Sequence, residues 1–184
     1  ILVPDADLPQ PVVDGLEDFL RLLWDVKLEV GHSVRTLRQC SEEAEKDLNT
    51  ITNLIESRFL LGKHRLFEIM RRNIATDQMW PPQDFFSAKR EEQRKRHLRG
   101  NDASNLEPNI KECRGGLRDI QTIAWVAKRH YGAASLIDLV RSGFLIEKEY
   151  HALAEAQDFL WRIRFELHDL TNMHEDRLLF DHQR

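Results

Sequence analysis

Apolar residues recur at helical spacing along most of the chain. Near the start, Val12, Leu16, Phe19, Leu20 and Leu23 lie three or four residues apart, which predicts an amphipathic helix. The same spacing predicts further helices over residues 41–62, 66–74, 85–98, 117–131, 134–141 and 147–170. The pattern therefore indicates a largely helical protein.

Two short segments depart from this spacing. Ile1-Leu2-Val3 stops at Pro4, and an apolar run with no start signal before it is typical of the end of a strand that begins upstream. Residues 28–34 are apolar at Leu28, Val30 and Val34 and include Gly31, which favours a strand or a bulged hairpin arm. We therefore expect a small amount of β-structure near the N-terminus.

Composition limits the class of protein. The chain has 184 residues, enough to bury a core, and its two cysteines, Cys40 and Cys113, have no metal-site or redox spacing, so we expect reduced thiols in the cytoplasm. The longest apolar runs are too short to span a membrane. A net charge of -4 argues against a DNA-binding protein. We therefore predict a cytoplasmic protein that binds neither DNA nor a membrane.

The segment with the most chemical information is Asn109 to Ile120. Gly115 and Gly116 directly precede a predicted helix, whose first N–H groups can bind an anion, and Lys111 and Arg118 could complete a phosphate site. The alternative is an ordinary turn into a helix, with Arg118 and Asp119 paired locally, because a Gly-Gly pair alone is a weak signal. Spacing alone favours that alternative.

The run Leu106 to Ile120 resembles the signature LEPxxKxxxGGLRDI of bacterial PII uridylyltransferases/uridylyl-removing enzymes. The part from the lysine to GGLRDI recurs in glutamine-synthetase adenylyltransferases. The usual proline before the glycine pair is Arg114 here, whereas the lysine, the glycines, the arginine and the aspartate are in place. Similar stretches cover essentially the whole chain, namely residues 23–36, 53–62 and 160–181.

This resemblance implies a fold and a domain organisation. We expect an α+β chain, mainly α, in which a remnant of a nucleotidyltransferase sheet packs on a helical bundle. The remnant would comprise Ile1 to Val3 and about Lys27 to Arg35. Residues 1–62 would form the C-terminal part of the nucleotidyltransferase-fold domain, and residues 63–184 the helical domain of the uridylyltransferase.

The resemblance also implies an activity. The family uses UTP and Mg²⁺ to uridylylate the PII signalling protein, and a separate domain, which we expect to be absent here, reverses the reaction in response to glutamine. By resemblance, Lys111, Gly115, Gly116 and Arg118 bind the nucleotide. The family's metal-binding Asp-x-Asp pair sits on a strand, and Asp5-Ala6-Asp7 lies among prolines where a turn is expected. We assign no metal ligand, and we expect the chain alone to be inactive.

Enzymes of this kind often use a third carboxylate. Glu29 lies between two apolar residues, as on a strand, and Glu56 is the competing candidate. The alternatives are the solvent face of an edge strand for Glu29 and an ion pair with Arg58 for Glu56. Both assignments stay open at this point.

Several other features have simpler interpretations. The basic run from Lys89 to Arg99 is interleaved with glutamates, which is typical of a solvated helix face. Phe159, Trp161 and Phe165 lie at helical spacing, and we expect them, like Trp125, in the core.

Two rival functions remain: a non-catalytic helical module that docks PII or neighbouring domains, and an adenylyltransferase of glutamine synthetase.

Overall fold

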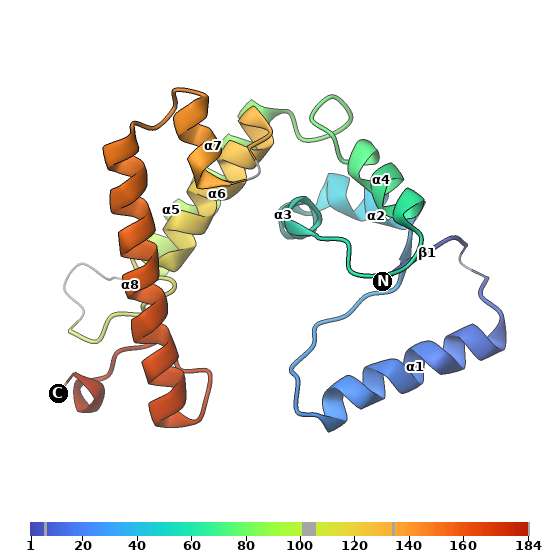
Figure 1. Ribbon diagram of the computed structural model, residues 1–184, viewed down its shortest axis with the longest axis horizontal. Helices are drawn as coiled ribbons and strands as arrows, with labels where there is room; N and C mark the ends of the chain where they lie inside the picture. Colours follow the sequence, from blue (N-terminus) through green and yellow to red (C-terminus); the bar gives the residue numbers. More distant parts are fainter. Residues whose placement is uncertain (6, 101–105, 134, 184) are drawn as a thin grey trace. The chain divides into compact units, whose positions relative to one another are not determined.

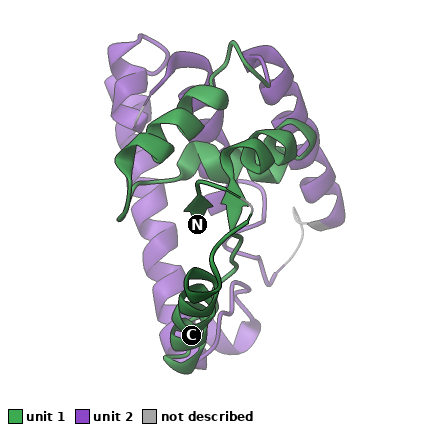
Figure 2. Ribbon diagram, turned by 90° about the vertical axis from the view of Figure 1, so that its right-hand side faces the viewer, with its two compact units in different colours: residues 1–79 green, residues 80–184 purple. Residues whose placement is uncertain are grey.

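The computed structural model describes residues 1–5, 7–100, 106–133 and 135–183, which form two compact units. Unit 1 is Ile1–Met79 and unit 2 is Trp80–Arg184, and Figure 2 colours them separately. Most described residues are helical, with one small sheet, so the expected α+β, mainly α class is confirmed (Figure 1). No helix in the described part of the chain is long and apolar enough to cross a membrane.

Unit 1 combines four helices with a two-stranded parallel sheet, in which Leu2 pairs with Arg35 and Val3 with Thr36. The Arg35 N–H also donates to the Ile1 carbonyl (3.0 Å). The elements are β1 (Leu2–Val3), α1 (Gln10–Asp25), β2 (Arg35–Thr36), α2 (Leu37–Lys46), α3 (Leu48–Glu56) and α4 (His64–Asn73).

The strand predicted over residues 28–34 is wrong, because that segment is irregular and β2 begins only at Arg35. The side chains of Leu28 and Val34 are exposed, so the apolar pattern there does not mark a buried sheet face. The expected sheet remnant is therefore reduced to β1 and β2. Glu29 lies in the irregular segment and not on a strand.

The single helix predicted from Ser41 to Gly62 is two helices. Thr36 starts α2 through a reciprocal capping box with Gln39, so Ser41 lies inside the helix and donates to the Leu37 carbonyl (3.1 Å). Asp47 has extended backbone angles, and its carboxylate accepts the N–H of Thr50 (2.7 Å) as the N-cap of α3. The chain therefore turns at Asp47, because a capping side chain satisfies the new helix start.

Helix α2 contacts both α3 and α4, and the core of unit 1 is buried along these helices. Its fully buried apolar side chains include Cys40, Ala44, Ile51 and Met70. The position after Gly62, where we expect a domain boundary, lies between α3 and α4 within unit 1, and the assignment of domains stays a prediction. Helix α4 packs with unit 1 because it completes this core.

Unit 2 is helical, and its predicted helices are confirmed to within a few residues at their ends. Helix α5 packs on α6, and α6 contacts both α7 and α8. Gly132 ends α6 in the left-handed conformation (φ 66°), as its position predicted. Ala134, where the next helix was expected to begin, lies outside the described residues. The elements are α5 (Pro82–Gly100), α6 (Leu117–Tyr131), α7 (Leu136–Arg141), α8 (Glu147–Thr171) and the 3₁₀ helix η2 (Phe180–His182).

The basic helix α5 is not a uniformly solvated face. The Lys89 side chain is only 2% exposed, and its ammonium lies 2.8 Å from Glu92 and 4.6 Å from the centre of the Trp125 ring. The carboxylate and the ring together offset the cost of burying this charge. The expectation of a solvated basic run is therefore wrong at Lys89.

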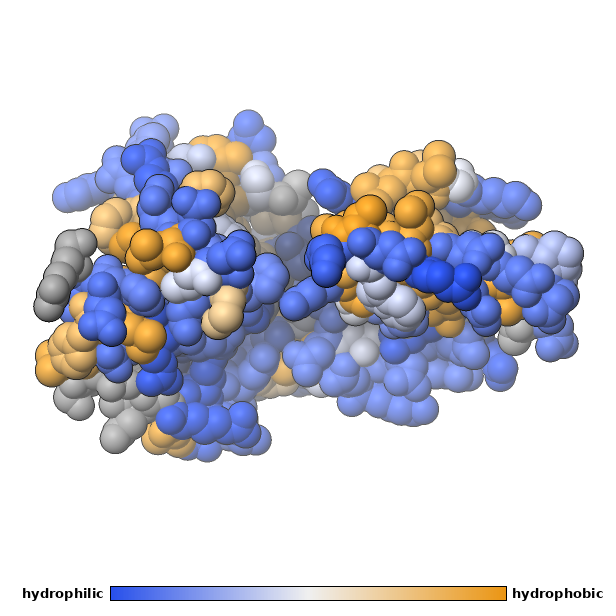
Figure 3. All heavy atoms as spheres, turned by 90° about the horizontal axis from the view of Figure 1, so that it is seen from below, coloured by the Kyte–Doolittle hydropathy of each residue, from blue (hydrophilic) through white to orange (hydrophobic). Residues whose placement is uncertain are grey.

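Three aromatic residues in the middle of α8 are exposed, contrary to expectation. Phe159 and Phe165 are 62% and 68% exposed, and Trp161 is 42% exposed beneath the Arg164 guanidinium. On the face shown in Figure 3, apolar side chains likewise reach the surface in patches among polar ones. The spacing predicted correctly that these residues lie on one helix. It did not show which face of that helix packs against the rest of the protein.

Candidate functional site

Both glycines of the candidate phosphate loop are required by the backbone geometry. Gly115 has φ +75°, a left-handed conformation that side chains disfavour. Gly116 is the N-cap of α6, and a Cβ atom there would lie 2.8 Å from the Ile110 carbonyl oxygen and 3.0 Å from those of Lys111 and Cys113. The pair lets the chain turn tightly into α6.

The N–H groups at this helix start are already bonded within the chain. Those of Gly116, Leu117 and Arg118 donate to the carbonyls of Cys113, Ile110 and Lys111 at 2.9, 3.1 and 2.8 Å. The Gly115 N–H donates to Asp119 Oδ2 (2.9 Å). A phosphate would have to displace these partners to use the amides, so the loop is not an open anion cradle in this conformation.

The Asp119 carboxylate joins the loop to α5. It accepts from Gln93 Nε2 (2.9 Å), pairs with the Arg96 guanidinium, and lies 3.1 Å from His97 Nε2, in addition to its bond from Gly115. Burial by itself raises the pKa of Asp119. The hydrogen bonds from Gln93 and Gly115 and the charges of His97 and Arg96 outweigh burial and hold that pKa below its ordinary value. A supporting role for Asp119 is therefore a prediction that rests on these four contacts.

A second carboxylate, Asp176, holds the other end of the loop. Its side chain accepts from Arg164 Nε (2.5 Å), lies 3.2 Å from His168 Nε2 and pairs with Lys111 Nζ at 3.7 Å. Its backbone carbonyl accepts the Ile110 N–H (2.7 Å). Burial raises the pKa of Asp176, but these hydrogen bonds and the charges of Arg164 and Lys111 lower it overall.

The segment after α8 continues this attachment. The Leu178 N–H donates to the Pro108 carbonyl (2.9 Å), and the Phe180 N–H donates to Glu107 (2.9 Å). Asn109 forms an antiparallel bridge with Arg177. The two stretches that carry much of the family resemblance, 106–120 and 160–181, therefore contact each other directly.

Lys111 and Arg118 each have a different protein partner. The Arg118 guanidinium donates to Gln121 (3.0 Å) and Glu112 (3.4 Å) and lies 5.5 Å from the centre of the Trp125 ring, whereas Lys111 pairs with Asp176. Both side chains are partly exposed, at 32% for Lys111 and 28% for Arg118. Their convergence on one phosphate stays a prediction.

The carboxylate candidates belong to unit 1, whereas the loop residues belong to unit 2. Glu29 is in the irregular segment 28–34, and Glu56 is the last residue of α3; both are exposed. Ala6, in the middle of Asp5-Ala6-Asp7, lies outside the described residues. Within the described residues, no group of three or more His, Cys, Asp or Glu side chains could hold a metal ion. The described residues therefore do not fit a magnesium site.

Sequence reasoning missed Asp176 and the α5 residues that bond Asp119. His168 precedes Asp169 in the sequence, but its side chain contacts Asp176 instead. The basic run on α5 contained Arg96 and His97, yet their spacing matched an exposed helix face as well as a buried one. No local signal in the sequence predicts these contacts, because the bonded residues lie on different elements.

Replacing Gly116 with alanine tests the tight turn. We expect Gly116→Ala to lower the free energy of unfolding by about 1–3 kcal/mol, since the new Cβ would press on three backbone carbonyls that cannot rotate away. Gly15→Ala is the control, because Gly15 lies within α1 with no atom near its added Cβ. Urea denaturation measures both, and equal stability of Gly116→Ala and wild type would contradict the geometry.

Lowered pKa values of Asp119 and Asp176 predict a loss of stability in acid. A carboxyl group with a lowered folded-state pKa contributes stability that is present above its unfolded pKa, about 3.9, and is lost as the pH falls through the folded value. The free energy of unfolding should therefore fall below about pH 4. Asp119→Asn should flatten this dependence in thermal melts between pH 3 and pH 7. An unchanged slope would show that Asp119 is not the responsible group.

Comparisons with known proteins identify the family. A family model described as GlnD PII-uridylyltransferase matches residues 84–184. A bifunctional uridylyltransferase/uridylyl-removing enzyme of Pseudomonas fluorescens (strain SBW25) is 56% identical over 172 residues, which cover 93% of this chain and 19% of that protein. The enzyme of the same name from Pseudomonas aeruginosa (strain LESB58) is 51% identical over 185 residues, covering 100% of this chain and 21% of that protein.

A more distant bacterium gives the same result. The bifunctional uridylyltransferase/uridylyl-removing enzyme of Vibrio atlanticus (strain LGP32) is 48% identical over the full 184 residues and 21% of its own length. The chain thus spans about a fifth of the curated relatives that it matches. No solved structure matches it. Because the family model covers more than half of the chain, including the Gly115-Gly116 loop, this protein belongs to the GlnD PII-uridylyltransferase family.

Proposed function

We propose that this chain is part of a nucleotidyltransferase that transfers uridylyl groups from UTP to the PII signalling protein. The observation that carries the proposal is the family match over residues 84–184, supported by 48–56% identity to bifunctional enzymes from three bacteria. We also propose that a separate domain removes the uridylyl group, that glutamine regulates the parent enzyme, and that the enzyme works in the cytoplasm.

The side chains of Lys111 and Arg118, more than the backbone amides, would bind the triphosphate. The amides of residues 115–118 have partners in the chain, whereas the Lys111–Asp176 and Arg118–Glu112 pairs are long, at 3.7 and 3.4 Å. Partly exposed ion pairs of this kind contribute little to stability and exchange partners readily. A phosphate oxygen could therefore replace either carboxylate without disrupting the loop.

Asp119 and Asp176 would position these cations without touching the nucleotide. Asp119 fixes the loop to α5 through Gly115, and Asp176 fixes Ile110 and Lys111 through its backbone and side chain. Each carboxylate would repel a phosphate if exposed to it, and each is instead surrounded by cations of the protein. Binding and support would thus be divided between neighbouring residues, Arg118 and Asp119.

Magnesium use belongs to the same proposal, with ligands that are not assigned here. The described residues do not assemble a carboxylate set for it, so Glu29 and Glu56 stay candidates for a third carboxylate only. The adenylyltransferase alternative is disfavoured, since the matched relatives are named uridylyltransferases.

The first test uses the 184-residue chain itself with PII, UTP and Mg²⁺. We expect no uridylylation above a protein-free control, because within the described residues neither strand carries the Asp-x-Asp pair needed for two-metal chemistry. UTP titration should still show weak binding, which Lys111→Ala and Arg118→Ala reduce. A chain that ignores UTP entirely would favour a non-catalytic docking module, and turnover by the chain would refute our view of its incomplete site.

A second test separates Arg118 from Asp119 in a full-length enzyme of the family that carries these residues. Arg118→Ala should lower kcat/KM for UTP by about 10- to 100-fold, equivalent to about 1.5–3 kcal/mol for a lost charged hydrogen bond, with little change in Tm. Asp119→Ala should lower Tm first, because it leaves Arg96 without its closest carboxylate. Lys148→Ala, on the exposed start of α8, is the control. An Arg118→Ala enzyme that melts early but uses UTP normally would reverse this assignment.

A further inference from the structure

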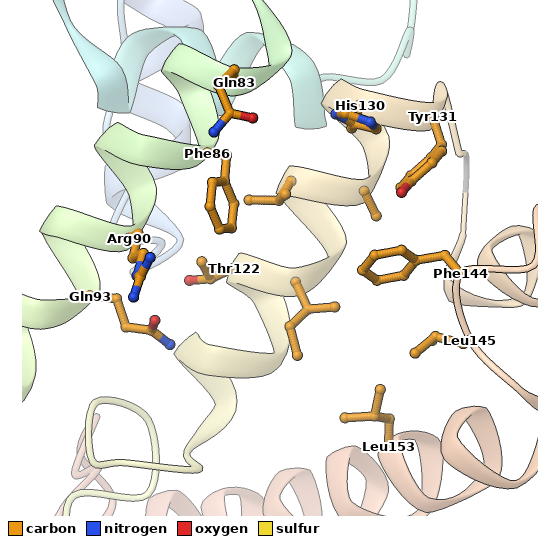
Figure 4. Close-up of a pocket in the computed structure, with 13 residues that line it drawn as sticks. Gln83, Phe86, Arg90, Gln93, Thr122, His130, Tyr131, Phe144, Leu145 and Leu153 are labelled. Atoms are coloured by element: carbon orange, nitrogen blue, oxygen red, sulfur yellow. The ribbon is translucent and has the colours of Figure 1, made fainter.

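Unit 2 contains an apolar groove of about 550 Å³ that the proposed UTP site does not use (Figure 4). Its wall is formed by Phe86 of α5, Ile123 of α6, Phe144 from the segment between α7 and α8, and Leu153 of α8. Neither Lys111 nor Arg118 lines it. The groove is therefore a separate feature of the same unit.

Large apolar side chains in this groove remain exposed. Phe86 is 39% exposed, Tyr131 is 44% exposed and Phe144 is 52% exposed. Figure 4 shows Phe86 and Phe144 directed into the same space from different elements. Exposed apolar surface that is gathered in one groove marks an interaction site more often than scattered single residues do.

The polar side chains that line the groove are basic or uncharged. They are Gln83, Arg90, Gln93, Thr122 and His130, with no acidic residue. Gln93 is engaged with Asp119, and Thr122 with the Arg118 carbonyl. Within the described parts of the chain, the exposed Arg90 guanidinium has no hydrogen-bond or ion-pair partner. An occupant should therefore bring a carboxylate to Arg90 as well as apolar side chains to the wall.

We propose that this groove docks an amphipathic helix that carries an apolar stripe beside an aspartate or glutamate. The helix would come from the part of the longer uridylyltransferase polypeptide that lies outside these 184 residues. The matched relatives have about four fifths of their length outside the aligned stretch, which supplies many candidate segments. A helix suits the site because its side chains at i, i+3 and i+4 can fill a groove bounded by other helices.

Other occupants fit less well. A buried small-molecule site usually has several polar groups directed at one ligand, whereas this lining is mostly apolar and two of its polar side chains, Gln93 and Thr122, are already bonded within the protein. The proposal does not depend on UTP binding, since the groove shares no residue with the Lys111 and Arg118 pair.

Photo-cross-linking tests the proposal in a full-length family enzyme that carries this chain in place of its own matching stretch. p-Benzoylphenylalanine at Phe144 should cross-link to a segment outside these 184 residues. Mass spectrometry of the digest should identify the sequence of that segment. Apolar residues should recur at helical spacing in it, with an acidic residue beside the apolar stripe. The same probe at Phe165, an exposed position on α8 outside the groove, should not give this product.

Charge reversal provides the second measurement. Arg90→Glu should reduce the yield of the Phe144 cross-link by about fivefold or more, since a like-charge contact would replace an ion pair, and changing the acidic residue of the cross-linked segment to lysine should restore it. Lys148→Glu should leave the yield unchanged.

Three outcomes would each overturn the proposal: cross-linking to a second copy, cross-linking to a segment without acidic residues, or no cross-link at all. Normal UTP kinetics in these variants would show that the UTP site is intact. The UTP kinetics therefore distinguish a failure of the docking proposal from a failure of the proposed function.

Discussion

The partly buried carboxylate of Asp119 determines the local structure around the candidate site. It lies in the first turn of α6, yet its partners are the N–H of Gly115 before the helix and three side chains of α5. A buried carboxylate without these donors would be strongly destabilising, so the four contacts require one another. The loop from Ile110 to Gly116 therefore has a fixed conformation only when α5 and α6 are packed together.

This arrangement is the basis for the division that we propose between groups that support the loop and groups that bind the nucleotide. The glycines allow the turn, the backbone amides are used within it, and Asp119 and Asp176 hold its two ends. Lys111 and Arg118 are the cations of the motif with partly exposed side chains and long, exchangeable ion pairs. A loop that is fixed before a ligand arrives loses less conformational entropy on binding, which favours tight recognition of an anion.

Much of the helical fold could be predicted from the sequence, because apolar spacing reports directly on amphipathic helices such as α1, α4, α6 and α8. Two errors arose where the local backbone departs from this pattern. Asp47 divides a continuous apolar stripe by capping a new helix, and residues 28–34 contain Val30 and Val34 but form no strand. The motif located Lys111, Gly115, Gly116 and Arg118. It could not reveal Asp176 or the burial of Lys89, since these depend on contacts between elements that are distant in sequence.

The central claim is that the Gly115-Gly116 loop is preformed and that side chains, not loop amides, meet the phosphate. Hydrogen–deuterium exchange of the amides of residues 115–119, with and without UTP, tests this claim most directly. Our account predicts slow exchange in the free protein, because each of these amides already has a partner in the chain, and little further slowing with saturating UTP. Fast exchange that becomes slow only when UTP is added would show that the amides form the anion site and would contradict the account.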